Sequence, residues 1–197
     1  AADIMQGGWV RLLYCYPDGI TDELIDTMLR HDNVCKYMDI PIQHFSDSVL
    51  GRMNRRNTKE SSVQIVEKLH DKGFVIRTTL IVGFPGETEQ DFAEMTDAVK
   101  ELRFDRLGVF RYSNEDGTPA EKLPGQISGE IKRKRYEQLM ALQEGISQQV
   151  CEQSVGKTMR VIVDGIDEQT GIAVGRTMEQ APEVDGITYI SSKKVLT

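Results

Sequence analysis

The sequence predicts an α/β fold with a parallel sheet, followed by a small all-β module. Apolar, strand-like segments alternate with amphipathic segments of helical period from residue 9 to residue 112, which is typical of parallel βαβ units. A helical pattern covers residues 128–154, and short β-rich runs separated by Gly, Asp and Pro follow from Gly156. We therefore predict an α/β part over residues 1–127, a connecting helix over 128–155, and a small antiparallel barrel or sandwich over 156–197.

Two βα units are expected in the first third of the chain. Residues 9–16 combine β-branched and aromatic side chains before a proline, and an amphipathic helix opens at Thr21. Residues 37–42 form the next predicted strand, and helices are expected near 46–54 and 58–72. The predicted caps of these helices are Ser46 and Thr58 at the N-termini and Gly73 at a C-terminus.

The strongest strand signal lies at residues 75–84, VIRTTLIVGF. Its near-continuous apolar run LIVGF is typical of a strand buried on both faces. A Pro-Gly turn and a capping box of Thr88 and Asp91 lead into a helix over 88–102, and residues 106–112 form the next predicted strand. The loops after these parallel strands are therefore the places to search for functional groups.

Charge and hydropathy limit the function classes. The formal net charge of −7 argues against a protein that wraps nucleic acid over most of its surface, and it favours a basic partner. We interpret the one dense cationic run, residues 132–135, as the solvated face of a helix. The chain has neither a run of about eighteen apolar residues nor a secretory signal pattern, so we predict a cytoplasmic protein with no membrane partner.

The cysteines do not form a recognisable site. Cys15, Cys35 and Cys151 lack the spacing of a disulfide framework or a self-contained zinc site, and we interpret them as packing thiols. No Cys-His pair within one motif, Walker loop or G-x-G-x-x-G run occurs either. The residues alone therefore indicate a partial α/β ligand-binding unit without a catalytic residue or a metal-ligand set.

Polar groups suited to a ligand follow two of the predicted strands. The Gln43 amide can hold ribose hydroxyls and the His44 imidazole can donate, accept or titrate, although an ordinary capped strand end is the alternative. In the loop Gly83 to Glu87 the glycines let a ligand approach the backbone and the helix beyond favours anions, although a structural turn is the alternative. Arg77 lies within a strand and needs a carboxylate partner, which could be a substrate or Asp39.

Four segments taken together resemble the methylthiotransferase branch of the radical S-adenosylmethionine (SAM) enzymes. They are DIPIQHFSDSVLGRMNRR, RTTLIVGFPGETEQDF, YSNEDGTPA and the closing β-rich module. Within that family, the Gln-His pair after DIP, the segment WVRLLYCYP and the later GRTMEQAPEVDG are similar to the ribosomal-protein branch, the RimO type. The resemblance covers nearly the whole chain.

The resemblance implies the later units of an open (βα) radical SAM barrel followed by a TRAM β-barrel. It implies that a methylthio group is added to the β-carbon of an aspartate on the twelfth protein of the small ribosomal subunit. In such enzymes one SAM donates the methyl group, and another yields the deoxyadenosyl radical that abstracts hydrogen. The SAM-binding residues expected from the resemblance are Gln43, His44, Arg77, Gly83, Phe84, Pro85, Gly86 and Glu87.

The sequence departs from the family at its metal centres. The family binds a [4Fe–4S] cluster through a C-x-x-x-C-x-x-C loop and a second cluster through a further domain, and neither motif occurs here. We therefore expect that this chain binds no cluster and is by itself an inactive fragment, while the full-length enzyme carries two. The end at Val195–Thr197 leads us to expect a TRAM barrel that lacks one or two strands.

Charge also bears on the partner. From Gly156 onward the chain has five Lys and Arg against six Asp and Glu, a balance that suits a basic ribosomal protein better than tRNA. Two alternatives stay open: a tRNA methylthiotransferase with an RNA-binding TRAM domain, and a non-catalytic binding protein on a partial barrel. The family also implies an electron donor such as flavodoxin or ferredoxin.

Overall fold

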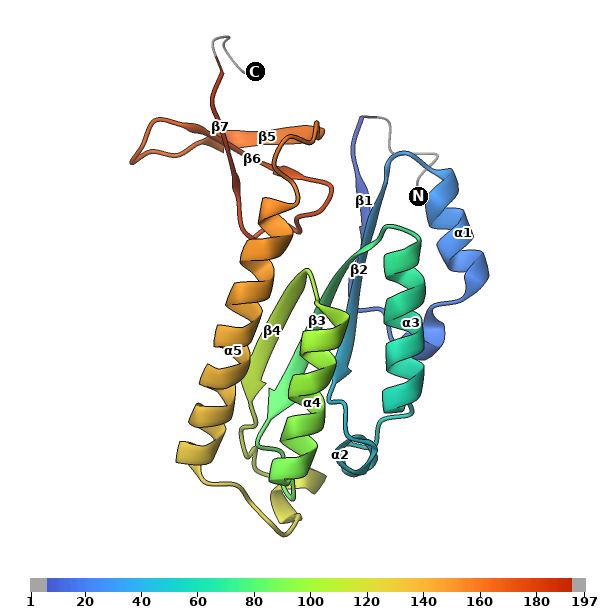
Figure 1. Ribbon diagram of the computed structural model, residues 1–197, viewed down its shortest axis with the longest axis vertical. Helices are drawn as coiled ribbons and strands as arrows, with labels where there is room; N and C mark the ends of the chain where they lie inside the picture. The colour runs from blue at the N-terminus through green and yellow to red at the C-terminus, as the bar shows by residue number, and fades with distance from the viewer. Residues whose placement is uncertain (1–6, 193–197) are drawn as a thin grey trace.

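The computed structural model describes residues 7–192, which form two separate sheets (Figure 1). The larger sheet has four strands in sequence order, every neighbouring pair parallel: β1 (Val10–Leu12), β2 (Val34–Gln43), β3 (Val75–Val82) and β4 (Arg106–Arg111). The smaller sheet is antiparallel and contains β5 (Val161–Ile166), β6 (Ala173–Thr177) and β7 (Thr188–Ile190). The predicted parallel α/β part followed by an all-β module is confirmed.

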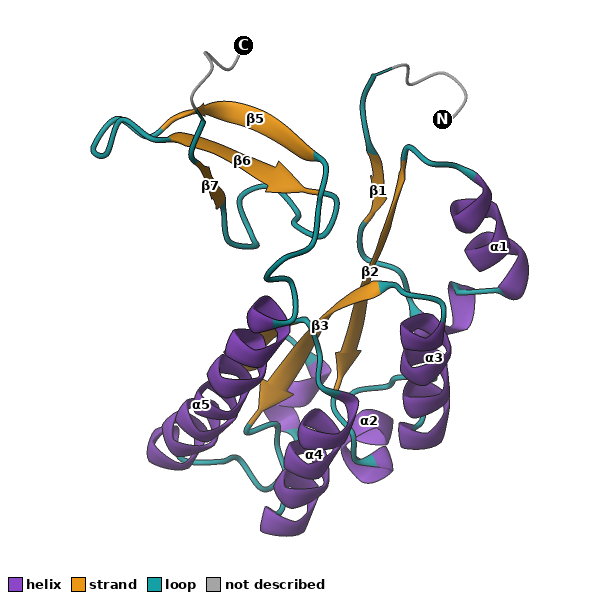
Figure 2. Cartoon of the chain, turned by 45° about the horizontal axis from the view of Figure 1, so that its top comes forward, coloured by secondary structure: helices purple, strands orange, loops and turns teal. Residues whose placement is uncertain are grey.

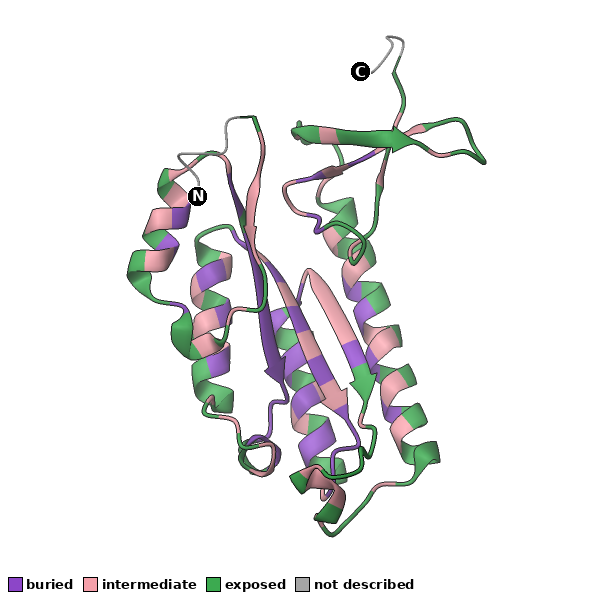
Figure 3. Ribbon diagram, turned by 180° about the vertical axis from the view of Figure 1, so that it is seen from behind, coloured by how far each residue is buried: buried purple, intermediate pink, exposed green. Residues whose placement is uncertain are grey.

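Helices cover one face of the larger sheet. Its strands are connected by α1 (Asp22–Arg30), α2 (Asp47–Arg52), α3 (Lys59–Asp71) and α4 (Glu89–Leu102), with a short 3-10 helix, η1 (Pro17–Gly19), before α1. A second 3-10 helix, η2 (Pro119–Lys122), follows β4. The long helix α5 (Gly129–Glu152) packs along β4 and α4 and leads to the small sheet. Seen from behind, the other face of the larger sheet carries no helix of the described chain (Figure 3).

Burial along β3 reflects this one-sided cover. Its residues alternate strictly, with Ile76, Thr78, Leu80 and Val82 buried and their neighbours partly exposed. The predicted burial of this strand on both faces is therefore wrong, because helices pack against only one side of the sheet. The buried side chains join those of β2, α3 and α4 in one apolar core.

Local sequence signals set most element ends. Thr88 and Asp91 form the predicted capping box at the start of α4, and the Thr58 hydroxyl caps α3 by accepting from the Ser61 amide. Gly73 follows α3 with φ of +76°, a conformation that glycine adopts without strain. Ser46 stands at the N-cap position of α2, but its hydroxyl makes no cap bond.

The first strand is shorter than predicted. The sequence favours a strand over 9–16, whereas β1 ends at Leu12. Tyr14 then adopts φ of +60°, and Pro17 opens η1, so the chain turns away from the sheet. Conversely, β2 begins at Val34, three residues before the predicted strand at 37–42.

The small sheet lies near the amino-terminal ends of β2 and β3, opposite their arrowheads (Figure 2). Within it, β6 passes very close to β5: a Cβ on Gly175 would lie 2.2 Å from the carbonyl oxygen of Ile162. Only glycine fits there. The predicted loss of strands at Val195–Thr197 concerns residues outside the described range.

Candidate functional site

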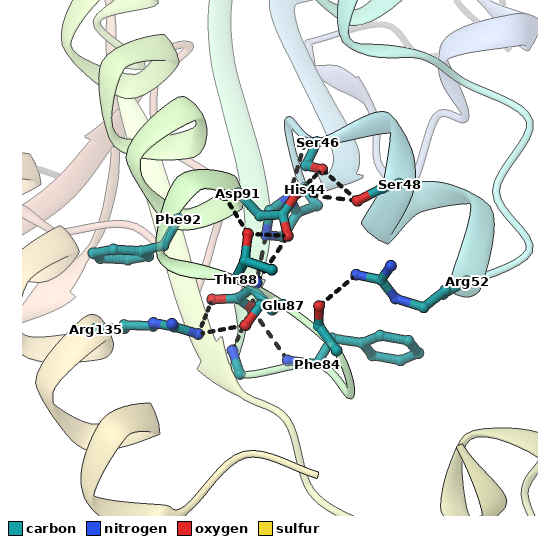
Figure 4. Close-up of polar contacts among 12 residues, drawn as sticks. His44, Ser46, Ser48, Arg52, Phe84, Glu87, Thr88, Asp91, Phe92 and Arg135 are labelled. Carbon is teal, nitrogen blue, oxygen red and sulfur yellow. Dashed lines mark hydrogen bonds and ion pairs between the residues drawn. The ribbon is translucent and has the colours of Figure 1, made fainter. Parts of the chain in front are cut away.

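The carboxyl ends of β2, β3 and β4 bring the candidate residues to one edge of the sheet. Gln43 ends β2, the loop Gly83 to Glu87 follows β3, and Tyr112 follows β4. The Phe84 ring meets the Tyr112 ring edge-on, with centroids 5.0 Å apart. This edge is where ligands of parallel α/β sheets bind, and Figure 4 shows the polar groups behind it.

Glu87 organises the loop after β3. It is only 2% exposed, and one carboxylate oxygen accepts hydrogen bonds from the Gly83 amide at 2.5 Å and the Phe84 amide at 3.2 Å. The other oxygen meets the Arg135 guanidinium of α5 at 2.8 Å (Figure 4). Arg135 also donates to the Glu89 carboxylate at 2.6 Å. Glu87 is therefore turned into the protein, where it holds the loop in shape.

Arg52 fastens the same loop from the other side. Its guanidinium donates to the carbonyl oxygens of Pro85 and Gly86, both at 3.0 Å. Gly86 has φ of +79° and packs against Gly125, whose added Cβ would lie 3.2 Å from the Gly86 backbone. A side chain at Gly86 would be strained and would press on Arg52.

A second buried carboxylate, Asp91, ties α2 to α4. One of its oxygens accepts hydrogen bonds from the hydroxyls of Ser46 and Ser48, and the other from the amide and hydroxyl of Thr88 (Figure 4). Burial alone would raise the pKa of Asp91, but these hydrogen bonds outweigh it and hold the pKa well below its usual range. The Ser46 hydroxyl is thus used here and not as the cap of α2.

His44 lies in the interior and not at the surface of the edge. It is fully buried, its Nδ1 accepts the Ser46 amide at 2.9 Å, and its Nε2 lies 3.7 Å from the Glu87 carboxylate. This Nε2 has no hydrogen-bond partner within residues 7–192. His44 therefore backs the loop after β3, and any effect on a ligand is indirect.

Gln43 has a different environment. It adopts φ of +76°, which turns the chain at the end of β2, and the register with β3 shifts at this point. In the described chain no hydrogen bond involves its side-chain amide, although the residue is only 8% exposed. A residue other than glycine held in this conformation at a strand end is a feature found at ligand sites.

Four amides of the loop after β3 and the start of α4 already donate to side chains of the protein. The Gly83 and Phe84 amides donate to Glu87, the Thr88 amide donates to the Asp91 carboxylate, and the Asp91 amide donates to the Thr88 hydroxyl. The predicted attraction of anions to free amides is therefore wrong for these groups, because the loop satisfies them internally. Gly83, Phe84 and Pro85 are themselves buried, so Gly86 is the partly exposed residue that the loop can offer a ligand.

Arg77 lies at the other end of β3. It stands five residues before the end of the strand, which corresponds to roughly 16 Å. Its guanidinium has two carboxylate neighbours, Asp39 at 3.6 Å and Asp185 at 3.5 Å. Of the two partners that the sequence left open, Asp39 is present, while Asp185, from the loop between β6 and β7, was not foreseen. A contact of Arg77 with SAM stays a prediction, and the geometry of the carboxyl edge gives it no support.

The Asp185 carboxylate also accepts a hydrogen bond from the Tyr37 hydroxyl at 2.6 Å. The Arg11 guanidinium lies over the Tyr37 ring, 4.5 Å from its centroid. Burial, together with the nearby carboxylate, raises the pKa of Tyr37. Arg11 donates to the carbonyl oxygens of Met178 and Gln180. These contacts fasten the small sheet to the amino-terminal end of the larger one.

The basic run at 132–135 is only partly solvated. Arg135 is 4% exposed and pairs with Glu87, and the Lys132 ammonium donates to the Tyr112 carbonyl at 2.9 Å. The interpretation of the whole run as a solvated face is wrong, because α5 turns these two residues towards the loop after β3. Burial lowers the pKa of Lys132.

The cysteines lie apart. Cys35 is buried and Cys15 half-buried, as expected of packing thiols, whereas Cys151 is exposed. Within residues 7–192, no three His, Cys, Asp or Glu side chains are grouped so that they could hold a metal ion. The described residues therefore do not fit an iron-sulfur cluster.

No helix of the described chain is long and apolar enough to cross a membrane.

Comparison with protein families accounts for both parts. The Radical SAM superfamily model matches residues 3–99, and the TRAM domain model matches residues 155–197. The chain therefore contains a radical SAM domain match and a TRAM domain match, one in each part. The parallel sheet is accordingly its radical SAM part, and the small antiparallel sheet lies within the TRAM match.

Relatives with high identity carry a specific name. The chain is 50% identical over 183 residues to "Ribosomal protein uS12 methylthiotransferase RimO" of Clostridium botulinum, covering 92% of this chain and 41% of that protein. A protein of the same name from Geobacter sulfurreducens is 49% identical over 187 residues, covering 93% and 42%. The chain thus spans about two fifths of the length of these relatives.

A solved structure supports the fold. Coproporphyrinogen III oxidase (HemN) from Escherichia coli, described as a radical SAM enzyme, aligns with 70% of this chain and 32% of its own, with a TM-score of 0.59 and 22% identity. At this identity the similarity concerns the fold alone. It agrees with the parallel sheet and its one layer of helices.

Proposed function

We propose that this chain is part of a radical SAM methylthiotransferase that modifies the β-carbon of an aspartate in the small-subunit ribosomal protein uS12. The observation that carries the proposal is 50% identity, over 92% of this chain, to proteins named for that activity. The division at 1–127, 128–155 and 156–197, the cytoplasmic location, and flavodoxin or ferredoxin as electron donor belong to the same proposal. No described contact bears on the electron donor.

In this proposal the carboxyl edge holds SAM. In this family SAM supplies the methyl group and the deoxyadenosyl radical. Gln43 is suited to the ribose hydroxyls, since its side-chain amide has no partner in the described chain. Gly83 to Gly86 form the wall, in which Gly86 is partly exposed and the Lys132 side chain covers the Gly83 backbone. Phe84 and Tyr112 contribute aromatic surface beside that wall.

The remaining residues of the edge act on the wall. Glu87 and Arg135 fix the loop from inside, Arg52 fixes it from outside, and His44 fills the space behind Glu87. Such fixed surroundings hold a ligand in one orientation, which is what a reaction at one carbon atom requires. The described residues supply no iron-sulfur ligands, so we derive no step through a cluster.

A chimera tests the proposed function. This chain would replace the corresponding segment of the Clostridium botulinum relative, and the purified, cluster-reconstituted chimera would be given uS12 and, separately, tRNA. We expect mass spectrometry to show replacement of one hydrogen of uS12 by a methylthio group. A chimera that cleaves SAM but leaves uS12 unmodified, or that modifies tRNA, would overturn the proposal.

SAM binding is tested in the same chimera. Gln43→Ala should weaken SAM binding, while Gln64→Ala, on the exposed side of α3, serves as the matched control. The loss of one or two hydrogen bonds to a ribose predicts an increase in the SAM Kd of roughly tenfold. Equal SAM affinities for the two variants would remove Gln43 from the site.

A further inference from the structure

A polar cavity lies beside the carboxyl edge, between the loop after β1 and the segment that joins α2 to α3. It measures about 490 Å³. Tyr16 and Asp18 line it from the first segment, and residues 53–57 line it from the second. None of these residues belongs to the SAM site proposed above.

The cavity contains cationic groups that lack counter-charges. Arg55 lies over the Tyr16 ring, 5.1 Å from its centroid, and its Nη1 is buried without a hydrogen-bond partner in the described chain. Neither Arg55 nor Arg56 has a carboxylate partner among residues 7–192. Asp18 is the one acidic side chain of the lining. A buried guanidinium N–H without a partner is costly, and an anionic ligand would satisfy it.

Exposed aromatic rings accompany these cations. Tyr14 is 78% exposed and Tyr16 54% exposed, both in the loop after β1. The loop is held in place because Asp39 accepts the Tyr14 amide at 3.1 Å and its backbone carbonyl accepts the Cys15 amide. Aromatic faces next to guanidinium groups are the combination that stacks nucleobases and binds phosphates of single-stranded nucleic acid.

The sign of the charge distinguishes RNA from protein as the partner. Residues 52–59, RMNRRNTK, carry four cationic and no acidic side chains, whereas the chain as a whole has a net charge of −7. A basic ribosomal protein would be repelled by this segment, but the RNA that such a protein binds would be attracted. Arg52 of the same segment is fastened to the loop after β3, so the cavity adjoins the proposed SAM site.

We propose that the cavity binds the phosphate backbone of single-stranded RNA, with Arg55 and Arg56 on the phosphates and Tyr16 stacked on a base. The link between this RNA and the substrate rests on the proposed function. If the substrate is a ribosomal protein, the cavity would bind the RNA to which that protein is attached. RNA binding by the cavity is independent of the methylthio chemistry.

The test measures binding of a fluorescent oligouridylate of about ten nucleotides to the 197-residue chain by anisotropy at several salt concentrations. The variant Arg55→Gln/Arg56→Gln is compared with Arg30→Gln/Arg133→Gln, which removes the same charge from exposed helix surfaces. We expect the first variant to bind at least about tenfold more weakly and to lower the salt slope by about 1.4, while the control changes little. No binding by the native chain, or equal affinities of the two variants, would overturn the proposal.

Further probes separate the possible ligands. Tyr16→Ala should weaken binding and Tyr16→Phe should not, if the ring stacks on a base. Inorganic phosphate or polyglutamate that displaces the oligonucleotide as well as unlabelled RNA does, at equal ionic strength, would overturn RNA as the ligand. Circular dichroism establishes that each variant is folded.

The two proposals fail in different ways. If the chimera leaves uS12 unmodified while RNA binding still depends on Arg55, the proposed function fails and the RNA site stands. If the chimera modifies uS12 but RNA binding is absent or does not depend on Arg55, the RNA site is wrong and the proposed function stands.

Discussion

The two ends of the parallel sheet are held by different kinds of contact. At the carboxyl end, the Arg135–Glu87 pair spans 2.8 Å, and its side chains are 4% and 0% exposed. At the amino-terminal end, the Arg77–Asp185 pair spans 3.5 Å, and the arginine side chain is 20% exposed. The first pair joins the loop after β3 to α5, while the second joins β3 to the loop between β6 and β7 of the small sheet.

This difference indicates two levels of attachment. The carboxyl edge depends on groups that are buried with the core, so its shape should be lost only when the radical SAM part unfolds. The contact with the small sheet depends on a few polar side chains, so it can open without disturbing that core. Three substitutions test this comparison.

The largest effect is expected at Glu87. Glu87→Gln leaves the buried Arg135 guanidinium with only the exposed Glu89, and the free energy of unfolding should fall by about 3 to 5 kcal/mol. Urea denaturation measures this change. The control Glu137→Gln, in an exposed pair with Arg133, should cost less than about 1 kcal/mol. Similar losses for both variants would mean that the edge is not held from inside.

Asp91 should make the free energy of unfolding depend on pH in the acid range. Its folded pKa is below the unfolded value of about 3.9, so its contribution is complete above about pH 5 and is lost as the pH falls towards the folded pKa. Asp91→Asn should cost about 2 kcal/mol at pH 7 and flatten the decrease in unfolding free energy between about pH 5 and pH 2. Asp97→Asn, at an exposed position of the same helix, is the control. An unchanged acid slope in Asp91→Asn would contradict the assignment.

The smallest effect is expected at the contact between the two sheets. Tyr37→Phe removes the hydroxyl that donates to Asp185, at a cost of about 1 to 2 kcal/mol. Because this contact joins two parts, proteolysis between α5 and β5 should accelerate while the urea midpoint of the larger sheet changes little. Tyr189→Phe, at a residue that is 56% exposed, is the matched control. A loss as large as that of Glu87→Gln would abolish the distinction between the two ends.

Sequence patterns predicted the elements better than the contacts between them. The alternation of strands and helices and the capping box at Thr88 are local properties, and the structure confirms them. The end of β1 was missed because the turn at Tyr14 depends on Asp39, a residue 25 positions away. Likewise, nothing near Asp185 indicates that it receives the hydroxyl of Tyr37.

Arg135 is a case that sequence could have resolved. It lies within a run of four cationic residues, and such a run is typical of the solvated face of a helix. However, the buried residues of α5 follow a helical spacing of four, four and three: Arg135, Leu139, Gln143 and Ile146. This periodicity places Arg135 on the buried stripe, so a buried carboxylate partner could have been expected, although not its identity as Glu87.

The close approach of β6 to β5 at Gly175 has a practical consequence for genetics. Any other residue there forces the two strands apart, because the three atoms nearest to its Cβ all belong to Val161 and Ile162 of β5. One codon therefore offers a way to disable the TRAM sheet and leave the parallel sheet intact, so that a loss-of-function phenotype can be assigned to one half of the polypeptide.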